Sequence, residues 1–194
     1  MNTTYFQQSL FCYEVENCLA QMKNIKIFFN NLDEEHKKNI TFRARMNSKG
    51  SMHFDEDKFV RKLSSKIKFD ESKAHFYRIM KNYDFIIVGY DSTATYELLS
   101  YKKIPFFVIL PKNYLKNYIH DARKDFLILK KKKLLFDSPV DAANEINNKS
   151  DMLIQEWEQK INSIQLKNFS KKYSMRSVLK FLKLKSLIDK NIIN

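Results

Sequence analysis

Continuous apolar runs alternate along this chain with segments in which apolar residues recur every three or four positions. The clearest runs occupy residues 85–88 and 106–110, and neither contains a charged side chain. Runs of this length are typical of strands that are buried on both faces of a parallel sheet. Shorter or alternating runs at residues 40–45, 67–69 and 134–136 predict further strands.

Helical periodicity fills the intervals between these runs. An apolar spacing of four and three residues predicts one long amphipathic helix over residues 8–36. Further helices are expected over residues 93–101 and 111–124. Ser138, followed by proline, is a strong helix start, because serine caps a helix and proline fits its first position. Asp151 is expected to cap a separate, later helix.

Strands therefore alternate with helices about five times, which predicts an α/β fold. We expect a single Rossmann-like, doubly wound domain in which about five parallel strands carry helices on both faces, followed by a helical C-terminal extension. The expected division is a long N-terminal helix at 1–36 that packs on the domain, the Rossmann-like domain at 37–150, and C-terminal helices at 151–194, the last of them basic and amphipathic.

The composition narrows the classes of function. The chain of 194 residues has 35 Lys and Arg against 22 Asp and Glu, and a formal net charge of +13. This excess predicts an anionic partner, whether a phosphorylated small molecule, nucleic acid or an anionic membrane; the alternative is that lysine is simply the common surface residue. Two glycines are too few for a Walker P-loop or the dinucleotide glycine fingerprint. No histidine pair has the spacing of a metal site, so neither a metal nor a cofactor is predicted.

A polar cluster follows the apolar run at 85–88. It reads Asp91-Ser92-Thr93 and opens the next helix. A helix start offers unpaired backbone N–H groups and partial positive charge, and two hydroxyl groups add donors, so this corner suits a phosphate. Glu97 lies one turn further on the same helix face, where its carboxylate could accept hydrogen bonds from a ribose. In the alternative interpretation, Asp91 or Ser92 only caps the helix and Glu97 faces solvent.

Several motifs occur in order along residues 27–173. They are Phe42-Arg43-Ala44-Arg45 and the following Gly50, Asp91-Ser92-Thr93-Ala94-Thr95-Tyr96-Glu97, Leu98-Leu99, Ile104-Pro105-Phe106, Ala142-Ala143 and Trp157. In this order they resemble the C-terminal half of GT-B glycosyltransferases, and most closely a family of bacterial transferases for surface carbohydrates. Trp157 is interpreted either as a core anchor or as a stacking platform.

The resemblance implies that residues 37–150 bind a nucleotide-sugar donor. The residues that correspond to diphosphate ligands are Ser92, Thr93, Asp91, Arg43 and Arg45. Glu97 corresponds to a ribose ligand, and Gly50 and His53 belong to a loop near the donor. The alternatives are that the two arginines form salt bridges on the solvent side and that His53 is a surface residue.

GT-B enzymes react between two Rossmann-like domains, and this chain has room for one. The resemblance therefore implies the donor-binding part of a truncated or split enzyme, with the acceptor domain on another chain and no catalytic residue assigned. The main alternative is a basic α/β module that binds nucleic acid, which is disfavoured because no RNA or DNA motif is recognisable. Another is a non-catalytic remnant that assembles with a partner.

The last segment of the chain has the pattern of a basic amphipathic helix. Residues 171–190 carry seven basic side chains and one acidic one between apolar residues. Such a helix either lies on an anionic membrane or packs one face on protein. Because the sequence shows neither a spanning apolar stretch nor the pattern of a signal peptide, we expect a cytoplasmic location, with peripheral contact to the inner face of the membrane as an option.

Overall fold

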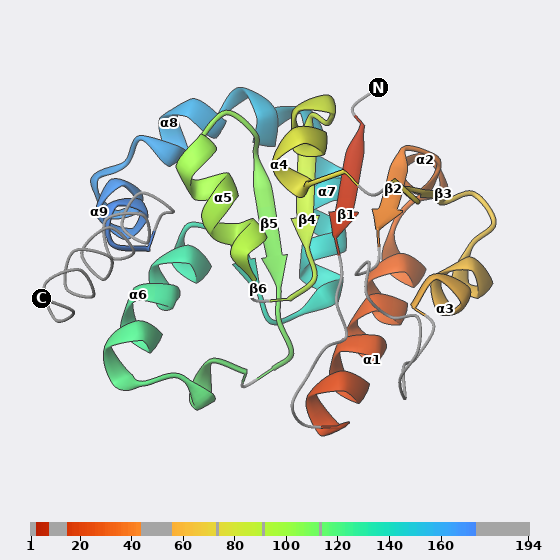
Figure 1. Cartoon of the computed structure of the whole chain (residues 1–194), viewed down its shortest axis with the longest axis horizontal. Coiled ribbons are helices and arrows are strands. Elements are labelled where there is room, and N and C mark those ends of the chain that lie inside the picture. The colour runs from red at the N-terminus through yellow and green to blue at the C-terminus, as the bar shows by residue number, and fades with distance from the viewer. Residues whose placement is uncertain are drawn as a thin grey trace, which may run out of the picture.

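One parallel sheet organises the molecule. The computed structural model describes residues 3–7, 15–43, 56–72, 74–90, 92–112 and 114–173 (Figure 1). Their strands form a six-stranded sheet in the order β3-β2-β1-β4-β5-β6, and every pairing is parallel. The strands are β1 (Thr4–Gln7), β2 (Ile40–Arg43), β3 (Lys68–Phe69), β4 (Phe85–Val88), β5 (Phe106–Ile109) and β6 (Leu135–Phe136). The predicted α/β class is confirmed, and the sheet has one strand more than expected.

The additional strand, β1, lies in the middle of the sheet between β2 and β4. The sequence pattern does not indicate it, because polar Thr4 and Gln7 at its ends leave only Tyr5-Phe6 between them and no longer apolar run. Phe6 of β1 is buried and stacks on Phe42 of β2, with ring centroids 5.7 Å apart. The N-terminal segment, for which the sequence predicts only a helix, thus also supplies a central strand.

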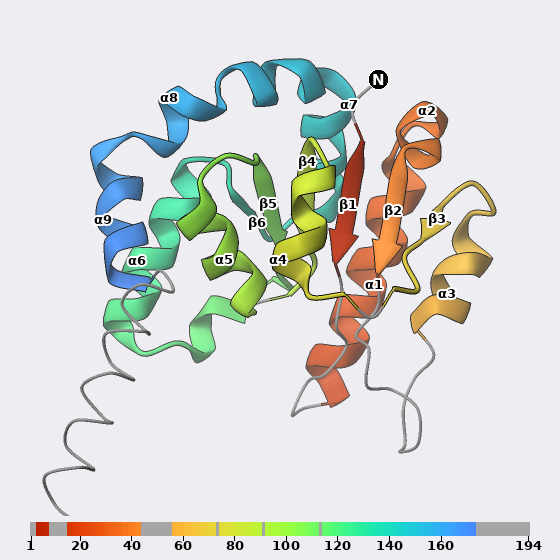
Figure 2. The same ribbon diagram turned by 45° about the horizontal axis from the view of Figure 1, so that its top comes forward.

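Helices cover both faces of the sheet (Figures 1 and 2). They are α1 (Val15–Asn31), α2 (Glu34–Lys38), α3 (Glu56–Leu63), α4 (Phe76–Ile79), α5 (Thr93–Tyr101), α6 (His120–Lys131), α7 (Pro139–Gln155), α8 (Trp157–Ile161) and α9 (Ile164–Tyr173), with 3₁₀ turns η1 (Met80–Asn82) and η2 (Tyr114–Asn117). Helices α1, α3 and α7 pack on one face, and α4, α5, α6, α8 and α9 on the other.

The packing of helices on both faces of the sheet explains the continuous apolar runs. Ile86 and Val88 of β4 join the core beneath α5, while Phe85 and Ile87 point to the opposite core. Because successive strand residues face opposite sides, a strand covered on both faces needs an apolar residue at every position. All four residues of β4 and of β5 are buried.

Several helix boundaries differ from the sequence prediction. The long N-terminal helix ends at Asn31, and α2 begins only after Asp33. The helix expected at 111–124 is instead the turn η2 followed by α6. Asp151 lies inside α7 and not at a helix start, whereas Ser138 caps α7 by accepting a hydrogen bond from the Asp141 N–H at 3.2 Å. The predicted helix starts are thus correct only in part.

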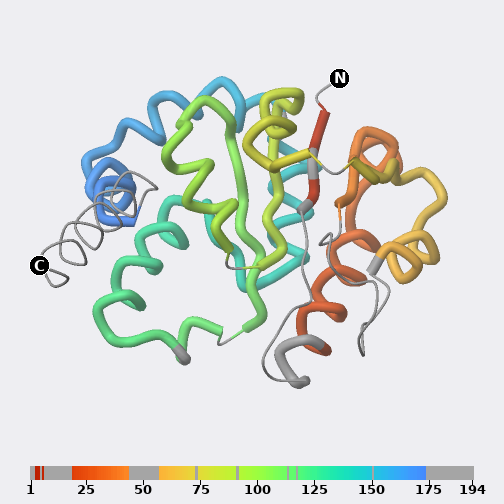
Figure 3. Tube along the Cα trace, viewed as in Figure 1, coloured from red at the N-terminus to blue at the C-terminus, as the bar shows by residue number. Residues whose placement is uncertain are grey.

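The carboxyl ends of the strands meet at one edge of the sheet. Gln7 of β1 pairs in register with Arg43 of β2 on one side and with Val88 of β4 on the other. The chain builds β1, β2 and β3 outward in one direction and then returns to place β4 beside β1 (Figure 3). The strand order therefore reverses between β1 and β4, which is where open α/β sheets bind ligands.

Candidate ligand-binding site

The segment after β4 begins α5 at this reversal point. Ser92 is the N-cap of α5, with extended backbone angles, and its Oγ accepts a hydrogen bond from the Ala94 N–H at 3.2 Å. A serine hydroxyl that accepts one bond can still donate its proton to a ligand. Thr93, the first residue of the helix, is exposed. The corner thus combines a helix start with two hydroxyl groups beyond a strand's carboxyl end.

Glu97 lies on the same helix, one turn beyond Thr93. Its side chain is half-buried, and burial raises the pKa of its carboxyl above the ordinary value, while the nearby His75 acts in the opposite direction. It does not simply face solvent. A partly desolvated carboxylate gains from hydrogen-bond donors such as ligand hydroxyl groups.

Thr95, in the first turn of α5, was not singled out by sequence reasoning as a separate site. It is fully buried, and its Oγ1 has no hydrogen-bond partner. A buried hydroxyl without a partner lowers the free energy of unfolding, because it has lost its hydrogen bonds to water and gained none in the protein. Its place within the block from Asp91 to Glu97 is the only signal in the sequence that could have indicated it.

Arg43 occupies a buried position at the end of β2. It is 6% exposed, its Nη1 lies 3.3 Å from Asp70 Oδ2, and its Nη2 donates to the Ala74 carbonyl at 2.7 Å. Arg43 thereby connects the end of β2 with Asp70, which follows β3, and with Ala74, which precedes His75. This salt bridge is buried and not on the solvent side, and a contact of Arg43 with phosphate stays a prediction.

The other predicted site residues are Asp91, Arg45, Gly50 and His53, and all four lie outside the described residues. The structure therefore brings together Ser92, Thr93 and Glu97 on one helix. It also places Arg43 at the same edge of the sheet, two strands away from β4.

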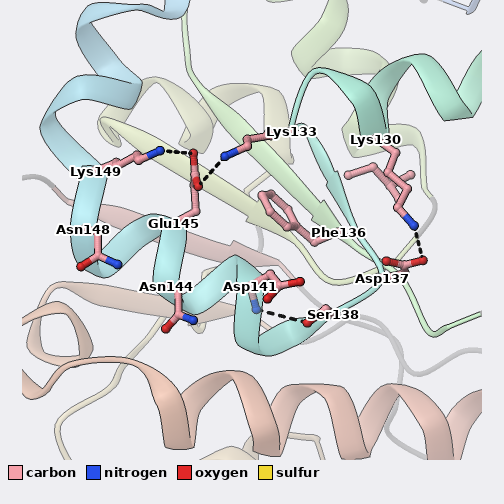
Figure 4. A pocket seen from close by; sticks show the side chains of 11 residues that line it. Lys130, Lys133, Phe136, Asp137, Ser138, Asp141, Asn144, Glu145, Asn148 and Lys149 are labelled. Carbon is pink, nitrogen blue, oxygen red and sulfur yellow. Dashed lines mark hydrogen bonds and ion pairs between the residues drawn. The ribbon is translucent and has the colours of Figure 1, made fainter.

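Two cavities lie further along this side of the molecule. One, of about 490 Å³, is formed by the end of α6, by β6 and the residues that follow it, and by α7 as far as Lys149 (Figure 4). Its charged groups compensate one another, since Glu145 pairs with Lys133 at 3.2 Å and with Lys149 at 3.7 Å. The other, of about 140 Å³, lies at the ends of β5 and β6 beneath η2 and α6. Lys130 and Asp137, 2.5 Å apart, line both cavities.

The C-terminal helices α8 and α9 pack on the same face of the sheet as α5. Trp157 is 5% exposed, and its Nε1–H donates to the Lys102 carbonyl at 2.8 Å, directly after α5. Its ring meets Phe106 of β5 edge-on. Trp157 is therefore a core anchor and not a stacking platform. The basic segment at 171–190 lies outside the described residues beyond Tyr173.

The corner at α5 supplies donors for an anion and a carboxylate for hydroxyl groups, so the arrangement is suited to binding. Within the described ranges, no three His, Cys, Asp or Glu residues gather closely enough to hold a metal ion. None of the helices that the structure describes is long and apolar enough to cross a membrane.

The fold defines a parallel α/β domain of the class that binds ligands beyond the carboxyl ends of its strands. The model of a family described as LIC12162 family transferase matches residues 2–184, so the chain belongs to this transferase family. Neither the curated proteins nor the solved structures contain a match to the chain.

Proposed function

We propose that this chain is the nucleotide-sugar donor-binding domain of a GT-B-like transferase that acts in the synthesis of bacterial surface carbohydrates. The observation that carries the proposal is the α5 corner, because Ser92, Thr93 and Glu97 stand at the reversal of the strand order. The diphosphate binds at the helix start and the ribose at Glu97. Membership of a transferase family supports group transfer as the reaction class.

Two further features support a Rossmann-like nucleotide fold. The order β3-β2-β1-β4-β5-β6 is the order of doubly wound domains that bind nucleotides at the switch point. The helix α5 also begins only five residues after the end of β4, so its start lies at the carboxyl edge of the sheet.

The mechanism assigned to this domain is stabilisation of the leaving group. As the bond between the sugar and the diphosphate breaks, negative charge grows on the diphosphate, and the N–H groups of α5 with the hydroxyls of Ser92 and Thr93 offset it without a metal ion. In a GT-B enzyme a second domain binds the acceptor. We assign that domain to another part of the enzyme, which completes the active site.

Titration calorimetry with a panel of nucleoside diphosphates tests the proposal. At least one member should bind, and Glu97→Ala should weaken the nucleoside diphosphate but leave inorganic pyrophosphate unchanged, because only the ribose contact is lost. Glu158→Ala is a matched control, since Glu158 is exposed on α8. Absence of binding to every nucleotide, combined with tight, salt-sensitive binding of DNA or RNA, would show that the basic nucleic-acid alternative is right.

A further inference from the structure

The 140 Å³ cavity lies at the same edge of the sheet as the α5 corner. Leu110, which follows β5, lines it, and β5 is the neighbour of β4. Cavities that enclose a whole small-molecule ligand usually measure about 300–1,000 Å³. This cavity therefore suits one chemical group of a ligand whose remainder lies outside it.

The charges in this cavity are not balanced. Among the lining residues that the structure describes, Lys116 of η2 and Arg123 and Lys130 of α6 are cations, and Asp137 is the only carboxylate. Asp137 pairs with Lys130 at 2.5 Å. Lys116 and Arg123 form no ion pair or hydrogen bond with another side chain that the structure describes. The lining residues thus carry a net formal charge of +2, whereas the 490 Å³ cavity has equal numbers of cations and carboxylates.

The apolar floor of the cavity strengthens the attraction of these cations for an anion. Leu110 and Leu135 are buried beneath it, and Leu127 of α6 adds an apolar wall that is 40% exposed. An apolar surface lowers the local dielectric constant and strengthens the attraction of a cation for an anion. Arginine in addition matches the planar geometry of a carboxylate or the oxygens of a phosphate with two parallel hydrogen bonds.

We propose that this cavity binds an anionic group, a carboxylate or a phosphate, carried by the part of the donor that is transferred. This assignment rests on the proposed function, in which the diphosphate occupies the α5 corner and the attached sugar extends along the edge past β5. The donor would then be an activated sugar with a negative charge of its own. Lys116 and Arg123 select this sugar against a neutral one.

Nuclear magnetic resonance of the ¹⁵N-labelled chain tests the cavity with three probes, namely glucose, glucuronate and glucose 6-phosphate. Glucuronate or glucose 6-phosphate should shift the amide signals of residues 114–116, 123 and 127, and glucose should not. The two charged probes distinguish a carboxylate from a phosphate as the preferred group. The double variant Lys116→Gln/Arg123→Gln should weaken the charged probe at least tenfold. The control Lys112→Gln/Lys124→Gln removes the same charge from exposed residues that do not line the cavity, and should change its affinity less than twofold.

Three results would overturn the inference. Neither charged probe shifts these signals, or both double variants weaken binding equally, or a nucleoside diphosphate that binds at the α5 corner displaces the charged sugar from the cavity. The last result would assign the cavity to the nucleotide itself. The probes need no nucleotide, so a failure of nucleotide binding leaves the test of the anion site intact and is recognised separately.

Discussion

The buried pair of Arg43 and Asp70 offers the sharpest test of how the edge of the sheet is built. The two side chains are 7% and 11% exposed, and the guanidinium also donates to the Ala74 carbonyl. Arg43→Met keeps the bulk of the side chain but leaves the Asp70 carboxylate buried without its cation. Breaking a buried pair in this way costs about 3–5 kcal/mol of unfolding free energy. For a chain of this size, that corresponds to a fall in Tm of about 6–20 °C.

Urea unfolding of the unaltered chain and of four variants measures this cost. Asp70→Asn should destabilise the domain strongly, because it removes the carboxylate that faces the buried guanidinium. Its neighbour provides the control: Glu71 pairs with Arg61 at 2.9 Å, but these side chains are 76% and 51% exposed, so Glu71→Gln should cost less than about 1 kcal/mol. Arg43→Met/Asp70→Asn combines the two single changes and removes both charges, so it should lose much less stability than the sum of the single changes.

The same variants decide between a structural role and a phosphate-binding role for Arg43. If its role is structural, Arg43→Met binds nucleoside diphosphates within about threefold of the unaltered chain, measured at a temperature where both are folded. The reasoning is refuted if Arg43→Met costs less than about 1 kcal/mol while its nucleotide affinity falls more than tenfold.

Three further changes test α5 and its anchor. Burial raises the pKa of Glu97 in the folded chain above its pKa in the unfolded chain. The folded chain therefore loses stability as the pH rises from the lower of these two pKa values through the higher one. Glu97→Gln should therefore stabilise the chain at pH 7, with a gain that vanishes near pH 4, and yet weaken nucleotide binding; no gain at pH 7 would argue against a desolvated carboxylate. Thr95→Val removes a buried hydroxyl without a partner and should raise stability by about 1 kcal/mol in thermal unfolding, whereas a loss would mean that the hydroxyl is bonded. Trp157→Phe deletes the bond to the Lys102 carbonyl and should cost about 1–3 kcal/mol in urea unfolding, and an unchanged midpoint would contradict the core-anchor role.

Local sequence patterns were sufficient for the strands that are buried on both faces. The apolar runs at β4 and β5 predict these strands within one residue of their ends, because burial on two sides excludes polar residues from the whole strand. The helix start at Ser138 was equally clear, since capping depends on a few neighbouring residues. The polar corner at Ser92 was recognisable for the same reason.

Features that depend on distant partners could not be read from the sequence. The place of β1 at the centre of the sheet follows from pairing with β2 and β4, which lie 36 and 81 residues further along the chain. Arg43 has the same sequence environment whether it binds phosphate or Asp70, and only the approach of β3 selects the salt bridge.

The sequence by itself thus determined the α/β class and the chemistry of the corner at α5, because both depend on short-range periodicity and capping. Only the tertiary structure decided that this corner stands where the strand order reverses. It likewise decided that Lys116 and Arg123 line one cavity at the same edge of the sheet. Strand order and the convergence of separate helices are set by long-range packing, which no local pattern of residues records.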